Sequence, residues 1–147
     1  MTDGPFEVAT GDEAPRSGTG REAAVRTAFE GLLNIRRVLD GPDASTPAQW
    51  ERLQPVRAVS LALEAAGIAP SAVDAAGRRC ATGYRVGAAD RPSVARVEWL
   101  GPPGGGAAYT ATESLQRCAE VLRRLGWVAL EYRGPRRHHY LEVEPAG

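Results

Sequence analysis

Three stretches of the chain repeat apolar residues with the 3.6-residue period of an amphipathic helix. The first stretch opens with Thr19 and Glu22 at the spacing of a capping box, and Asp40-Gly41-Pro42 ends it. Its apolar residues are Val25, Ala28, Phe29, Leu32, Leu33, Ile35 and Leu39. The pattern predicts a helix from residue 19 to about residue 40.

The second helical stretch runs from Thr46 to Gly67, with Pro47 suited to the first helical position and Gln49 completing a capping box. Pro55 lies inside it and removes one backbone hydrogen bond, so the helix is expected to bend there or to divide near Gln54. Because the loop between them is short, the first two helices are expected to form an antiparallel hairpin.

The third helix is expected from about Ala111 to Leu125, opened by a capping box of Thr110 and Glu113. Its inner face is predicted to carry Leu115, Cys118, Ala119, Leu122 and Leu125. Gly126 is expected to end it.

Four other stretches alternate apolar and polar residues, which predicts β-strands at about 79–86, 94–100, 127–132 and 140–143. A short turn or helix is expected at 71–76, and the Gly/Pro-rich stretch 101–106 is expected to be a loop. In strand 127–132 we expect the side bearing Val128 and Leu130 to face the third helix, with Phe29 and Leu33 closing the same core.

These elements predict an α+β fold with two N-terminal helices followed by an antiparallel sheet in β-β-α-β-β order, the helices packed on one sheet face. Residues 1–18 are rich in Gly, Pro, Thr and acidic residues, which predicts a disordered N-terminal tail. Residues 19–147 are expected to form a single domain.

Composition narrows the class of protein only slightly. The 147 residues carry 18 basic and 18 acidic side chains, so no net charge attracts nucleic acid or an anionic membrane. Every basic residue is arginine, which together with the Ala, Gly and Pro content suggests a GC-rich bacterial genome. Without a long apolar run or a secretion-type N-terminus, a cytoplasmic protein is expected.

Motifs for cofactors, metals and nucleophilic catalysis are weak. The glycine-rich stretch 101–106 lacks the Lys of a phosphate-binding loop, and the sequence contains no G-x-S-x-G. Cys80 and Cys118 are predicted to be buried thiols, since no CxxC spacing supports zinc. No cofactor and no metal are therefore expected, and an enzyme is disfavoured.

The turn at 133–139 contains three arginines and two histidines and no acid. It is the densest same-sign cluster in the sequence. The candidate binding residues are Arg133, Arg136, Arg137, His138 and His139. They could contact phosphate or an acidic protein, or they could form a solvated turn that protects a strand edge.

Three function classes follow from these patterns. The favoured hypothesis is a non-enzymatic protein-binding or adaptor module, acting through a sheet surface on a protein partner or on a second copy as a homodimer. The alternative is nucleic-acid binding by hairpin 133–139, with Tyr132 or Tyr140 stacking on a base. A third is a small enzyme whose pocket gathers His138 or His139 with a sheet residue such as Tyr84, Glu98 or Glu142.

Overall fold

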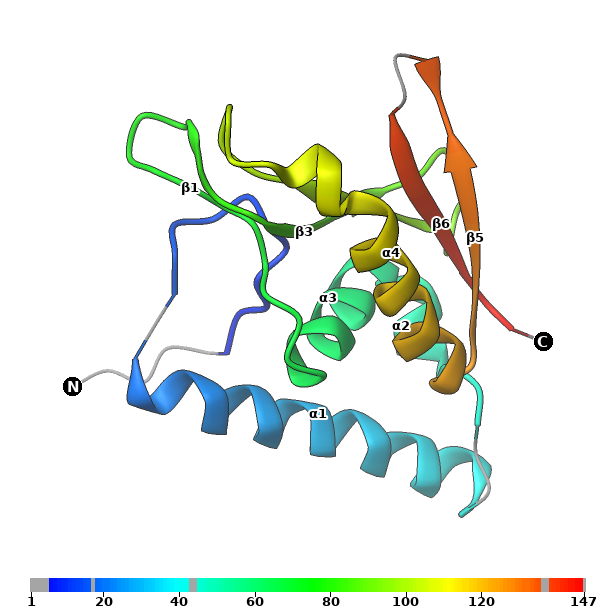
Figure 1. Ribbon diagram of the computed structural model, residues 1–147. Helices are drawn as coiled ribbons and strands as arrows, with labels where there is room; N and C mark the ends of the chain where they lie inside the picture. The colour runs from blue at the N-terminus through cyan, green and yellow to red at the C-terminus, as the bar shows by residue number, and fades with distance from the viewer. Residues whose placement is uncertain (1–5, 17, 43–44, 136–137, 147) are drawn as a thin grey trace.

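The computed structural model describes residues 6–16, 18–42, 45–135 and 138–146. The predicted α+β class with antiparallel strands is confirmed, and the described residues form four helices where three were predicted (Figure 1). The helices are α1 (Thr19–Asp40), α2 (Gln49–Leu53), α3 (Pro55–Ala65) and α4 (Ala107–Arg124). None of these described helices is both long enough and apolar enough to cross a membrane.

The second predicted helix divides at Gln54, whose φ of −129° and ψ of 63° are not helical. Pro55 then becomes the first residue of α3, a position where its missing N–H costs nothing. The predicted cap at Thr46 was wrong, because α2 begins at Gln49 and the backbone N–H of Ala48 donates to the Glu51 carboxylate at 2.9 Å.

The predicted strand order was also too simple. A four-stranded sheet has the order β3-β4-β6-β5, built from β3 (Gly83–Ala88), β4 (Ala95–Leu100), β5 (Trp127–Arg133) and β6 (His139–Pro145). A separate pair, β1 (Ala72–Val73) and β2 (Arg79–Ala81), precedes it.

The single strand predicted at 79–86 was therefore wrong, because the chain changes sheets at Thr82. Gly83 lies so close to the backbone of Ala69 and Pro70 that a Cβ atom would overlap it. Tyr84 donates to Ala69 O at 3.1 Å, and Ser71 donates to Tyr84 O at 2.8 Å. The segment leading into β1 thus lies against the start of β3, where only a glycine fits.

Helices α3 and α4 pack against the four-stranded sheet, and α1 packs against α3 (Figure 1). The core between them is largely apolar. Its most deeply buried large side chains include Leu63, Tyr84, Val97, Leu115, Leu122 and Leu141. Trp99 joins β4 to α4 by donating from Nε1 to Thr110 Oγ1 at 3.1 Å.

Strand β5 turns the opposite side toward the helices from the one predicted. Trp127 and Ala129 are buried in the core, at 3% and 1% exposure, whereas Val128 and Leu130 are exposed. Phe29 packs against the core beneath α4, but Leu33 packs only in the smaller cluster around α1. The predicted contact between α4 and Val128 or Leu130 was wrong.

Helix α1 also buries a different stripe from the one predicted, since Ile35 and Leu39 are exposed and Arg36 is 3% exposed. The Arg36 guanidinium donates to both Glu51 carboxylate oxygens at 2.7 Å and to Leu125 O at 2.8 Å. One buried cation therefore ties α1 to α2 and to the end of α4.

The segment 6–16, placed by the sequence in a disordered tail, makes specific contacts with the domain. Thr10 O accepts from Val86 N at 2.7 Å, and Ala9 O accepts from the buried Tyr84 hydroxyl at 2.8 Å. Asp12 lies between Arg79 and Arg85. Burial opposes ionisation of Asp12, but the two arginines outweigh it and lower its pKa. The segment covers the free edge of β3.

The two cysteines differ in environment. Cys118 is buried, and burial raises its pKa to about 12, so its thiol is held in the unreactive protonated form. Cys80 is exposed, which contradicts the prediction that both are buried. Cys80 lies on β2, which belongs to the separate two-stranded sheet and not to the sheet that forms the main core. An alternating pattern on β2 therefore does not bury this side chain.

Candidate functional site

The face of the sheet turned away from α3 and α4 bears a row of apolar side chains along β5. Val128 is 36% exposed, Leu130 44% and Tyr132 39%. These three residues are called the β5 strip. They alternate with Trp127 and Ala129, which face the core, so strand geometry alone places them together on the outer face.

Beside the β5 strip, the outer face is charged in both signs. Strand register sets Leu130 opposite Glu142, and Glu142 opposite Arg96. Arg96 Nη2 lies 3.7 Å from Glu142, and Arg91 Nη1 lies 3.2 Å from Glu144. Acids and arginines therefore neutralise one another across β4 and β6. The outer face consists of the apolar β5 strip beside a surface on which positive and negative side chains are paired.

An aromatic cluster lies at the end of this face next to turn 133–139. The rings of Tyr132 and Tyr140 stack with centroids 5.7 Å apart and an interplanar angle of 16°. The Arg96 guanidinium lies 4.3 Å from the centroid of Tyr140, a cation–π distance.

The structure separates the candidate residues of the basic turn. His138 Nε2 lies 2.8 Å from Glu98 on the outer face, whereas His139 Nε2 lies 3.0 Å from Glu131. His139 Nδ1 is 3.3 Å from Thr112 of α4, on the helix side of the sheet. The two histidines thus point to opposite faces, as the sequence predicts for neighbours in a strand.

Arg133 is 70% exposed, and its guanidinium is 4.0 Å from Glu131. Arg136 and Arg137 lie outside the described residues. Both histidines and Arg133 therefore have an acid close by, which reduces the positive field that the sequence suggests.

The outer edge of β5 is protected by Arg123. Its Nη2 donates to Ala129 O at 2.7 Å, so this carbonyl points away from β6 and is already bonded. Another strand could add to this edge only by displacing Arg123 from Ala129. The β5 edge is therefore occupied at Ala129.

The enzyme hypothesis requires a pocket beside His138 or His139. Tyr84 is buried on the helix side of the sheet, opposite to Glu98 and Glu142. Among the described residues, the larger hollows have neither histidine in their walls. No group of three or more metal-ligating residues is assembled in that part of the chain either. The geometry gives this hypothesis no support.

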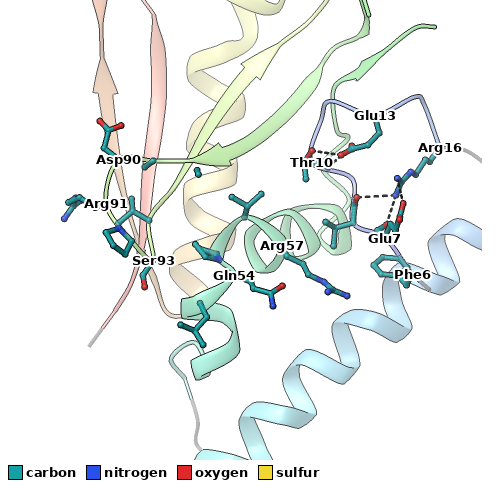
Figure 2. Close-up of a pocket in the computed structure, with 18 residues that line it drawn as sticks. Phe6, Glu7, Thr10, Glu13, Arg16, Gln54, Arg57, Asp90, Arg91 and Ser93 are labelled. Carbon is teal, nitrogen blue, oxygen red and sulfur yellow. Dashed lines mark hydrogen bonds and ion pairs between the residues drawn. The ribbon is translucent and has the colours of Figure 1, made fainter. Parts of the chain in front are cut away.

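A large hollow lies elsewhere, between segment 6–16, the α2–α3 junction and the β3–β4 turn (Figure 2). It is an open groove of about 900 Å³, called the trough below. Its apolar lining includes Phe6, Val8, Leu53, Pro55, Val56 and Val94. A smaller hollow of about 320 Å³ adjoins it along α1 and shares Phe6, Val8, Gln54 and Arg57 with it.

Most charged groups around the trough are already engaged. Arg16 donates to Glu7 O at 2.7 Å and to the Glu7 carboxylate at 3.2 Å. Glu13 accepts from Thr10 N at 2.9 Å. Figure 2 joins both pairs by dashed lines but draws none from Arg57, whose side chain leaves α3 beside Gln54.

Comparison with protein-family models, curated proteins and solved structures finds no match to this chain. The function of this chain is therefore inferred from these surfaces alone. The turn and the residues Tyr132 and Tyr140 were predictable from the sequence, whereas the trough was not, because its walls come from three segments that are far apart in the sequence.

Proposed function

We propose that this protein is a non-enzymatic protein-binding module that forms a homodimer through the outer sheet face. The exposed β5 strip is the observation that carries the proposal. Three apolar side chains in one row on an accessible sheet face lose contact with water when a second protein covers them. On β5, Trp127 and Ala129 contribute to the core, whereas the residues of the β5 strip do not.

A second copy suits this face because its charges balance. In a two-fold dimer the same patch meets itself, so the surface must be complementary to its own image. Arg96 and Glu142 alternate in sign beside the strip, which lets each copy offer an arginine to the other copy's acid. A face of one sign would repel its own image. Because Arg123 already donates a hydrogen bond to Ala129 O at the β5 edge, the two copies are expected to pack sheet face against sheet face and not to pair their β5 strands.

Leu130→Arg should convert the dimer into a monomer. Leu130 is 44% exposed, so arginine fits the folded monomer. In the dimer its bulk would displace the apolar contact and its charge would lose water, while Glu142 opposite is already paired with Arg96. The dissociation constant should rise by about a hundredfold, which corresponds to about 3 kcal/mol. Sedimentation equilibrium at micromolar concentration measures it, with circular dichroism to confirm that the variant is folded.

The matched control is Val38→Arg on α1, where an apolar residue is 82% exposed on another surface. This variant should dimerise like the parent. A parent that is monomeric throughout the concentration range would contradict the proposal. The proposal would also be contradicted if Val38→Arg lost the dimer and Leu130→Arg kept it, because the dimer contact would then lie on α1.

Nucleic-acid binding is the second candidate function, and the stacked pair Tyr132 and Tyr140 favours it. Exposed aromatic rings on a sheet are platforms for unpaired bases, and Arg133 lies at the end of the same strand. Glu98 and Glu131 beside the histidines weigh against it, because they would repel phosphate.

For this second function, replacing Arg133, Arg136 and Arg137 together by glutamine should abolish binding to single-stranded oligonucleotides. Each lost phosphate contact should reduce the slope of log affinity against log salt by about 0.7 for a single strand. Fluorescence anisotropy over a salt series measures the slope. Equal slopes for parent and variant, or no binding by the parent at low salt, would exclude this function.

A further inference from the structure

We infer that the trough is a binding site for an aliphatic carboxylate, with Arg57 and Gln54 holding the acid group and the apolar wall holding the chain. This site is independent of the outer sheet face. It lies on the helix side of the molecule, at the junction of α2 and α3.

The wall of the trough is apolar where it is accessible. Leu53 is 71% exposed, although it is a large apolar side chain at the end of α2. Phe6 and Val8 line the groove from the N-terminal segment, and Val56 lines it from α3. A ligand that covers these side chains removes apolar surface from water, which favours an aliphatic body.

The acids that line the trough are held by other groups or turned away. Glu7 pairs with Arg16, and Thr10 holds the Glu13 carboxylate in place without cancelling its charge. Figure 2 shows the Asp90 carboxylate pointing away from the hollow. Arg91 is also engaged elsewhere, at 3.2 Å from Glu144 on the sheet.

Arg57 is then the cation available to a ligand. Among the described residues it has neither an ion-pair nor a hydrogen-bond partner, and its side chain is exposed. In Figure 2 the Gln54 amide and the Arg57 guanidinium point to the same side, one at the α2–α3 junction and one in the first turn of α3. Two adjacent donors beside an apolar wall match a carboxylate that carries an aliphatic chain.

The division of the second predicted helix makes this arrangement possible. Gln54 leaves the helical conformation, so α2 ends and α3 begins with a change of direction. Leu53 and Val56, on the two sides of this junction, consequently line the same groove.

The test is calorimetric titration of the full chain with dodecanoate below its critical micelle concentration. Saturable binding of one dodecanoate per chain is expected. Octanoate is four methylenes shorter and should bind roughly 250-fold more weakly, because each buried methylene contributes about fourfold in affinity. Dodecanol, which has the same chain without the acid, should bind about tenfold more weakly than dodecanoate.

Arg57→Gln should weaken dodecanoate binding by about tenfold and leave dodecanol binding unchanged, since it removes the charge and not the wall. The matched control is Arg26→Gln, an arginine on α1 that is 64% exposed in its side chain and outside the trough. It should bind dodecanoate like the parent. Leu53→Gln should weaken both ligands together.

Three results would overturn the inference: no saturable binding, equal affinity of the parent for dodecanoate and dodecanol, or equal loss in Arg57→Gln and Arg26→Gln. The dimer test with Leu130→Arg is separate. That variant should bind dodecanoate like the parent, so failure at one site is distinguishable from failure at the other.

Discussion

Glu51→Leu should lower the free energy of unfolding by about 3–5 kcal/mol, because it leaves the Arg36 guanidinium buried without its counter-ion. Arg36 is 3% exposed and Glu51 is 0% exposed, and two hydrogen bonds of 2.7 Å join them. The Glu51 carboxylate also accepts from Ala48 N at the start of α2. Urea denaturation followed by circular dichroism measures the loss.

The double variant Arg36→Met/Glu51→Leu should recover part of that loss, since two apolar side chains need no counter-ion. Ala48 N and Leu125 O still lose their partners in it. An exposed pair provides the control. Glu22→Gln removes a partner of Arg26 at a site where the Glu22 side chain is 87% exposed. It should change the stability by less than about 0.5 kcal/mol. A cost below about 1 kcal/mol for Glu51→Leu would mean that water reaches Arg36.

The sequence located the main helices and strands because their periods are clear, but it did not determine which side of β5 faces inward. Apolar residues occupy both sides of this strand, with Trp127 and Ala129 on one and Val128 and Leu130 on the other. A shift of one residue exchanges the two faces. Gly126 lies between α4 and β5 with a φ of +86°, and a Cβ there would overlap Ser45. The path into β5 therefore includes a close approach to a distant segment, which the pattern of the strand does not reveal.

The face of α1 was misjudged for a related reason. Counting only apolar residues extends its buried stripe to Ile35 and Leu39, whereas the structure continues the stripe from Leu32 to Arg36. An arginine in a sequence is ordinarily placed in water. It enters the core here because Glu51, fifteen residues away, and the carbonyl of Leu125 accept its hydrogen bonds. The pattern of a single helix cannot reveal those partners.

The candidate sites were predictable to different degrees. Neighbouring residues form the turn at 133–139, so their charge is visible in the sequence, but the acids that neutralise it lie on other segments, such as Glu98 on β4. The trough depends on the path of segment 6–16 and on the break at Gln54. The proline at 55 suggested that break, yet a break alone does not indicate a cavity.

Leu122→Ala should lower the free energy of unfolding by about 2–5 kcal/mol, whereas Leu39→Ala should change it by less than about 0.5 kcal/mol. Leu122 is 0% exposed on the inner side of α4, in the core that also contains Leu115 and Leu141. Removing its side chain creates a cavity between α4 and the sheet. Leu39 is 64% exposed at the end of α1, so the same substitution leaves no cavity. Parallel urea titrations compare them, and equal midpoints would contradict the placement of α4 on the sheet.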